Sequence, residues 1–244
     1  MSEPALVLVA HGSPDPRAEP VLEALTARIR SERPGLVVVL AHLGHAEPDV
    51  PRALRALVQQ GVSRVVVVPL LLTAAYHAKV DLPALLREAR VEHPDLGIEQ
   101  AAVLGPHPLL FALLRRRLAE AGAETDAAVV LGAIGTSDPA ANAELADVAA
   151  TLGATIGFAT GTPSVAEAVT KLRAAGARCI AVASYVLAPG QLPDRFRESG
   201  ADIVTEVLGA AGEIADVALW RYDEIVSPIA SAATPGYAET SGDR

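Results

Sequence analysis

The sequence predicts an α/β protein made of two tandem halves, each a four-stranded parallel sheet flanked by helices. Three observations lead to this fold class. Apolar runs of strand length alternate with helical stretches, glycine and proline separate them, and the order starts again after about 120 residues. A strand, a helix and a further strand in succession form a right-handed βαβ unit, which requires a parallel sheet. A repeat of this length is typical of a duplicated domain.

The first half contains four strand candidates, and a helical stretch follows each of them. The first strand is the apolar run "LVLVA", which ends at His11, where open α/β sheets place their ligands. Asp15 and Pro16 are expected to open the next helix as its N-cap and first residue. We expect the strands at 5–10, 35–41, 63–70 and 97–103, and the helices near 16–32, 48–60, 80–92 and 106–121.

The second half repeats the signals of the first. The segment "VVLGAIGTSDPAANAEL" (129–145) parallels "LVLVAHGSPDPRAEPVL" (6–22), because each has a strand, a Gly-Ser/Thr turn and an Asp-Pro pair that opens a helix. The segment "GARCIAVASYVLAPGQLP" (176–193) likewise parallels "GVSRVVVVPLLLTAAYHA" (61–78). These internal matches allow the two halves to be compared position by position.

The repeat predicts where the domains lie. We expect an amino-terminal domain at 1–122 and a carboxy-terminal, degenerate repeat at 126–226, with the boundary in the small and polar segment 121–127. Residues 227–244 lack periodicity and consist largely of small and polar types, which is typical of a flexible tail.

The composition limits the kinds of partner. A net charge of −9 and 3% aromatic residues argue against nucleic acid. No apolar run approaches the ~20 residues of a membrane span, and the amino terminus lacks a signal-peptide pattern. A single cysteine, Cys179, excludes an intrachain disulfide and suits a reducing cytoplasm. Neither G-x-G-x-x-G after a strand nor G-x-x-x-x-G-K-[ST] is present, so no nucleotide is expected. We expect a cytoplasmic protein that acts on a small molecule.

Two histidines distinguish the halves. The alignment of the repeats puts Ile134 opposite His11 and Leu192 opposite His77. The turns and buried runs persist in both halves, while both histidines occur in the first half only. If the fold needed these side chains, the second half would need them too. The comparison therefore places chemistry in the first half.

The predicted sheet brings these two histidines together. In a sheet ordered 2-1-3-4, the first and third strands are neighbours, and His11 and His77 follow their carboxyl ends. Two imidazoles at this point could bind a divalent metal through neutral nitrogens, and one could accept protons near neutral pH. The alternative is that each is a polar strand-end residue whose hydrogen bonds go to backbone.

Four other histidines have weaker signals. His42 and His45 end the second strand and could supply a third ligand or a second proton carrier; the alternative is that both are exposed polar residues before the next helix. His93 and His107 stand beside prolines at helix boundaries, and we interpret them as cap or turn residues.

Several polar residues near the two histidines are further candidates. Asp81 follows His77 by one helical turn and could orient its imidazole, or it could simply cap the next helix. Ser13 and the backbone amides of its turn form a potential anion cradle, to which Arg17 and Lys79 would add positive charge. The alternative for these three is a solvated surface position.

The motifs resemble a known family. "VAHGSPDPR", "PLLLTAAYHAKVDLP" and "YVLAPGQLPD", in this order on two half-chains, are similar to those of sirohydrochlorin chelatases of the SirB/CbiX type, from residue 5 to about 226. The resemblance implies two chelatase-like, Rossmann-like domains that face each other across a cleft. It also implies insertion of Co²⁺ or Fe²⁺ into the tetrapyrrole sirohydrochlorin without ATP, in cobalamin or sirohaem biosynthesis. The family's two histidines correspond to His11 and His77.

The sequence departs from this family at one position. The family often has a glutamate at the end of the second strand, and here Gly44 takes its place in "HLGHAEP". Either His45 or His42 replaces that ligand, or the third group is absent. A histidine in place of a carboxylate shifts the preference toward later divalent ions, so Ni²⁺ joins Co²⁺ and Fe²⁺ as a candidate substrate.

The resemblance also implies a division of labour. One histidine would ligate the metal while the other accepts pyrrole protons, and the pattern does not assign which does which.

A binding protein that holds metal or tetrapyrrole without turnover is the alternative function, and a hydrolase that uses His11 is a third. We expect a monomer, because the second half supplies the face that a single-domain version would obtain by dimerising.

Overall fold

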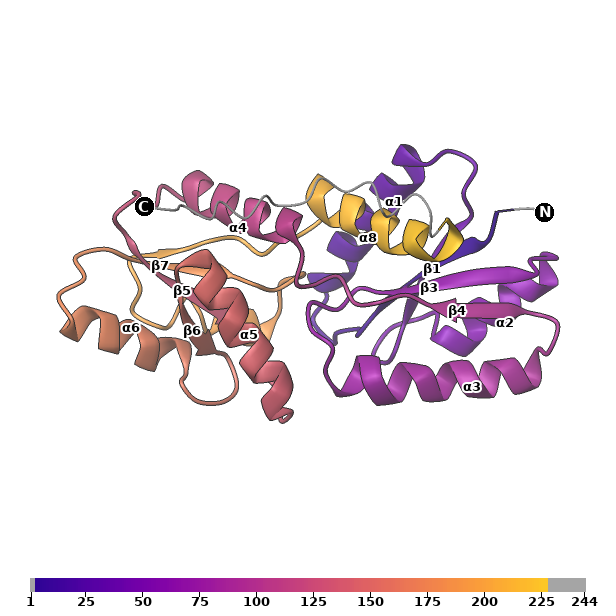
Figure 1. Ribbon diagram of the computed structural model, residues 1–244, viewed down its shortest axis with the longest axis horizontal. Helices are drawn as coiled ribbons and strands as arrows, with labels where there is room; N and C mark the ends of the chain where they lie inside the picture. The colour runs from indigo at the N-terminus through magenta and orange to yellow at the C-terminus, as the bar shows by residue number, and fades with distance from the viewer. Residues whose placement is uncertain (1–2, 228–244) are drawn as a thin grey trace, which may run out of the picture.

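The computed structural model describes residues 3–227, which form two parallel four-stranded sheets (Figure 1). Their strand orders are β2-β1-β3-β4 and β6-β5-β7-β8, so the predicted order is confirmed and the second half repeats it. The first half comprises β1 (Ala5–Ala10), α1 (Ala18–Glu32), β2 (Val38–His42), α2 (Val50–Gln59), β3 (Arg64–Pro69), the π-helical turn η1 (His77–Asp81), α3 (Leu82–Glu92), β4 (Gly97–Gln100) and α4 (Pro108–Glu120). The second comprises β5 (Ala128–Ala133), α5 (Pro139–Leu152), β6 (Thr155–Phe158), α6 (Val165–Ala174), β7 (Ile180–Ser184), α7 (Gln191–Asp194), β8 (Ile203–Val204) and α8 (Gly212–Val226).

Two sequence expectations concern the tail of the chain and the possibility of a membrane span. Of the expected tail at 227–244, all but Ser227 lies outside the described residues. Between residues 3 and 227, no helix combines the length and the apolar character that a bilayer crossing requires.

The first helix begins later than its sequence pattern predicts. The Asp15 carboxylate accepts the backbone N–H of Arg17 within a turn, so Asp15 closes that turn and α1 begins only at Ala18. In the second half the pattern holds without change, because Asp138 is the N-cap of α5 and accepts two backbone N–H groups of its first turn.

The helices cover both faces of each sheet, but not in the order of the two halves. On the first sheet, α2 and α3 cover one face, and α1 and α8 cover the other. On the second sheet, α6 packs against one face, and α4 and α5 pack against the other. The last helix of each half therefore lies on the sheet of the other half, as Figure 1 shows for α4 and α8. The predicted domains at 1–122 and 126–226 each keep their own sheet, but they exchange these helices.

Polar contacts fix α8 on the first half. The Arg33 guanidinium donates to both carboxylate oxygens of Asp223 at 2.7 and 2.6 Å. The Tyr222 hydroxyl donates to the Pro4 carbonyl oxygen at 2.5 Å, and the Tyr222 side chain is fully buried. One apolar core runs from the first sheet through α8 and α4 to the second sheet, so the two halves share their packing.

Candidate active site

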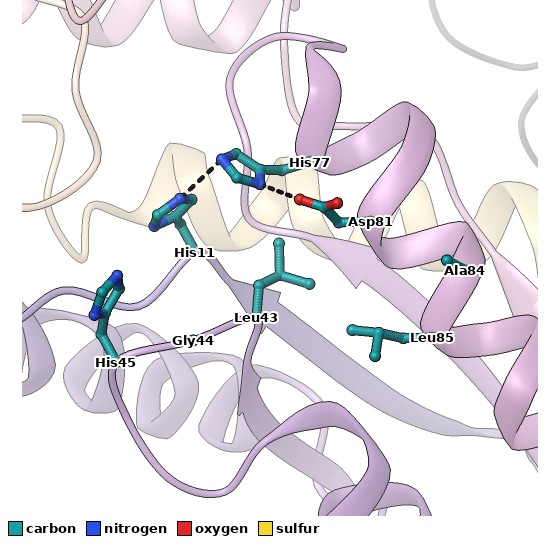
Figure 2. A pocket seen from close by; sticks show the side chains of 8 residues that line it. All are labelled: His11, Leu43, Gly44, His45, His77, Asp81, Ala84 and Leu85. Atoms are coloured by element: carbon teal, nitrogen blue, oxygen red, sulfur yellow. Dashed lines mark hydrogen bonds and ion pairs between the residues drawn. The ribbon is translucent and has the colours of Figure 1, made fainter.

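Two histidines meet at the carboxyl ends of the neighbouring strands β1 and β3. His11 directly follows β1, and His77 begins η1 after the loop that leaves β3. Their Nε2 atoms lie 3.0 Å apart, and their rings stand at 79° to each other (Figure 2). The structure thus brings together the two side chains that the repeat comparison singled out.

The outer nitrogen of each ring contacts an oxygen that only accepts hydrogen bonds. Nδ1 of His11 lies 2.9 Å from the Gly12 carbonyl oxygen, and Nδ1 of His77 lies 2.6 Å from Oδ2 of Asp81. Each Nδ1 therefore carries a proton, which leaves the two Nε2 lone pairs to face each other. Two lone pairs 3.0 Å apart repel unless a proton or a metal ion lies between them.

This spacing suits a transition-metal ion. Two nitrogens that each lie about 2.1 Å from an ion, and 3.0 Å from each other, subtend an angle of about 90° at the ion. That is the angle between neighbouring ligands of an octahedron. Within residues 3–227, no cluster of three or more His, Cys, Asp or Glu side chains is arranged to hold a metal. An ion held by only two protein ligands keeps other positions open and can leave again.

The local backbone explains how His77 is oriented. Residues 77–81 form a π-helical turn, a conformation that is frequent at functional sites. It places His77 and Asp81 on the same side, as the sequence spacing predicts. The Asp81 side chain makes no cap hydrogen bond at the start of α3, so the capping alternative for this residue is wrong. Its carboxylate instead holds the His77 ring with Nε2 toward His11.

His45 stands beside the pair in an unusual conformation. Among the described residues outside glycine, it alone has a positive φ, at 61°. Its ring stacks on His11 with the ring centroids 6.2 Å apart. His45 lies near enough to approach an ion on His11, but it does not point directly at the two Nε2 atoms (Figure 2).

His42 does not reach the pair. Its side chain is fully buried at the end of β2, with Nε2 3.1 Å from a Glu19 carboxylate oxygen and Nδ1 3.4 Å from the Pro48 carbonyl oxygen. Both sequence interpretations of His42, as a third ligand and as an exposed polar residue, therefore disagree with its position. His107 is the N-cap of α4, which confirms its predicted structural role, and burial lowers its pKa.

The histidine pair forms part of the wall of a large cleft between the halves. The cleft has a volume of about 800 Å³, and most of its lining side chains are apolar. Ser13, His11 and His77 line it from the first half, while Ile134 and Leu192 line it from the second. The positions that correspond in the two repeats therefore face the same cleft, with histidines on one side and apolar residues on the other.

The predicted cations near the cleft are paired with carboxylates of the second half. Arg17 lies 2.6 Å from Asp15 and 2.6 Å from Asp194, and Lys79 lies 3.2 Å from Asp138. Hydrogen bonds from Arg17 lower the pKa of Asp15 to about 2, and the Lys79 ammonium lowers the pKa of Asp138. Sequence spacing could not reveal these partners, because they lie in the other half of the chain.

Sequence reasoning did not single out Tyr185, a buried residue of the second half that also lines the cleft. Its hydroxyl donates to the Leu72 carbonyl oxygen at 3.3 Å, and a Cβ on Gly105 would come within 2.2 Å of it. Burial raises the pKa of Tyr185 well above its ordinary value, so the hydroxyl stays protonated. The available signal was one tyrosine in the apolar run that follows β7.

Comparisons with known proteins agree with this architecture. The CbiX family model matches residues 5–121. The sirohydrochlorin cobaltochelatase of Priestia megaterium is 28% identical over 208 residues, covering 80% of this chain and 67% of that protein. The sirohydrochlorin ferrochelatase of the same organism is 26% identical over 212 residues, covering 83% and 80%. The structure of SirB from Bacillus subtilis with Fe³⁺ superposes with a TM-score of 0.81 at 22% identity, covering 93% of this chain and 96% of that one.

The fold and the histidine pair define a two-domain, chelatase-type α/β protein. The first half of the chain matches the CbiX family model, and the chain as a whole is similar to sirohydrochlorin cobalto- and ferrochelatases. The predicted resemblance and fold class are therefore confirmed.

Proposed function

We propose that this protein inserts a divalent metal ion, Co²⁺ or Fe²⁺ and in principle Ni²⁺, into sirohydrochlorin without a nucleotide, for cobalamin or sirohaem biosynthesis. The observation that carries the proposal is the pair of Nε2 atoms, 3.0 Å apart, in the wall of a cleft of about 800 Å³. The relatives named as cobaltochelatase and ferrochelatase support the reaction class.

His11 and His77 are the proposed catalytic residues. Both Nε2 atoms hold the incoming ion, and His45 offers a third nitrogen once its ring turns. Insertion breaks two pyrrole N–H bonds and forms bonds from the ring nitrogens to the ion. As the ion leaves the pair, the two Nε2 lone pairs face each other again and accept one pyrrole proton between them. The second proton passes to solvent.

Arg17, Lys79 and the Ser13 turn are the proposed contacts for the carboxylates of sirohydrochlorin. Before the substrate binds, Asp194 is paired with Arg17, and Asp138 is paired with Lys79. A substrate carboxylate that pairs with Arg17 or Lys79 displaces Asp194 or Asp138, which then turns to solvent.

The protein is proposed to work as a cytoplasmic monomer, without nucleic-acid or membrane partners. The support is that one chain provides both walls of the cleft and that the exchanged helices join the halves through one core. Sedimentation of the purified protein checks this, and an obligate dimer would contradict it.

The experiment that tests the activity follows the absorbance of sirohydrochlorin with Co²⁺ or Fe²⁺. Repeated turnovers above the spontaneous rate are expected. A stoichiometric spectral change without product release would instead identify a binding protein, which is the alternative that the Gly44 substitution favours. Hydrolysis of generic phosphate esters with no metal insertion would identify a hydrolase.

A further inference from the structure

A second, smaller cavity adjoins the histidine pair and is formed by the first half alone. It has a volume of about 390 Å³ and lies between the loop after β2 and helix α3 (Figure 2). Its lining includes His11, His45, His77, Asp81 and Ala84.

The histidine pair lies between this side cavity and the cleft. His11, His45 and His77 line both spaces, whereas Asp81, Ala84 and the remaining residues of the side cavity do not line the cleft. An ion on the two Nε2 atoms could therefore be reached from either space.

The two spaces differ in what they admit. A tetrapyrrole in the cleft covers the pair from that side, because its ring nitrogens must come close to the ion that they receive. An ion cannot then pass around the ring to the pair. The side cavity is large enough for a hydrated ion, since six waters occupy about 180 Å³ at about 30 Å³ each. It is less than half the volume of the cleft.

The two spaces also differ in charge. The side cavity is lined by the Asp81 carboxylate and by no lysine or arginine, so its potential favours cations. Asp15 also lines the cleft, but the Arg17 guanidinium lies 2.6 Å from its carboxylate and balances its charge. We propose that the side cavity is the entrance for the metal ion, so that ion and tetrapyrrole reach the pair from different sides. This inference rests on the proposed function.

Ala84 offers a test that leaves the histidines and Asp81 in place. It lies half-buried on α3, lines the side cavity and does not line the cleft. Ala84→Glu, Ala84→Gln and Ala84→Lys place a negative, a neutral and a positive side chain of similar size at this position. All three residues are good helix formers. Val91→Lys, at a position 84% exposed on the same helix, is the matched control.

Steady-state kinetics with Co²⁺ and sirohydrochlorin gives the readout. Relative to Ala84→Gln, we expect Ala84→Lys to raise the KM for Co²⁺ about three- to tenfold and Ala84→Glu to lower it. The KM for sirohydrochlorin stays within twofold, and Val91→Lys behaves like the unmodified protein. The proposed entrance is wrong if the KM for Co²⁺ does not depend on the charge at position 84, or if the KM for sirohydrochlorin does.

A second measurement separates this inference from the proposed function. Stopped-flow absorbance follows Co²⁺ binding to each variant without any tetrapyrrole. The association rate is expected to rise from the Lys to the Gln to the Glu variant. If the unmodified protein inserts no metal, the proposed function fails, while this order of rates still supports the cation entrance. Equal rates in all three variants overturn it.

Discussion

The two halves of this molecule share a turn and differ in what the turn presents. Gly12 and Gly135 follow the first strand of each half with φ of 83° and 84°. A Cβ on either would lie within 1.7 Å of the Gly44 carbonyl oxygen or 2.2 Å of that of Thr160, so only glycine fits. The close approach of these backbones is therefore a requirement of the fold, independent of any chemistry.

The side chains beside this shared turn are different. His11 stands where the second half has Ile134. The carbonyl oxygen of His11 accepts the backbone N–H of Gly44, and that of Ile134 accepts the backbone N–H of Thr160. His45, with its positive φ, lies in the loop after β2. The corresponding loop of the second half, after β6, contains Gly161, which also has a positive φ. A histidine in a conformation that glycine adopts more easily indicates a use for its imidazole.

The second comparison concerns the turn after the third strand. His77 and Asp81 form a hydrogen-bonded pair on η1. The corresponding residues of the second half are Leu192 and Phe196, and Phe196 is fully buried against Gly132. The second half uses these positions for packing, and the first half uses them to aim an imidazole.

The largest expected effect comes from removing the pair. His11→Ala and His77→Ala should each reduce metal insertion at least tenfold, because each removes one of two ligands for the ion and half of the proton site. Ile134→Ala and Leu192→Ala, at the corresponding positions, should mainly raise the KM for sirohydrochlorin. Initial rates with matched circular dichroism spectra check this. Normal turnover in both histidine variants would disprove the site.

Asp81→Asn tests the orientation of His77. An amide that donates toward Nδ1 favours the wrong tautomer, so we expect insertion to fall about 10–100-fold. Co²⁺ affinity, measured by the absorbance of the bound ion, should fall in parallel. A variant that loses thermal stability but keeps its Co²⁺ affinity would show that Asp81 is structural only.

Gly12→Ala and Gly135→Ala separate the frame from the chemistry. Each forces an alanine into positive φ against a backbone oxygen, so we expect each to lower the free energy of unfolding by at least about 1–3 kcal/mol. Urea denaturation measures this loss. In the folded fraction, only Gly12→Ala should also impair insertion, because it displaces His11. Equal activity losses would mean that the halves contribute alike.

The smallest expected effect is at the ion pairs between the halves. Asp194→Asn removes one of the two carboxylates that hold Arg17, and Asp138→Asn removes the carboxylate beside Lys79, so the KM for sirohydrochlorin should fall about two- to fivefold. The lowered pKa of Asp138 keeps its carboxylate charged as the pH falls toward the usual range of aspartate. Its interaction with Lys79 is therefore complete above that range and disappears as the pH falls through the lowered pKa. A raised KM at neutral pH would show that the carboxylates assist binding.

The sequence predicted what depends on local pattern and repetition. Alternating strands and helices predicted both sheets, and the end of β1 predicted that His11 would reach His77. The position of α4 was not predictable, because the apolar pattern of a helix does not say which of two sheets it covers. The partners of Arg17 and Lys79 were hidden for the same reason, since Asp194 and Asp138 lie far away in sequence.

The crossed placement of α4 and α8 makes each half depend on the other to cover its sheet. A break between residues 121 and 127 would produce two fragments that each carry the other's covering helix. Each fragment would leave apolar surface exposed on one face of its sheet, because only α1 or α5 would remain to cover it. The two halves are therefore expected to fold only together.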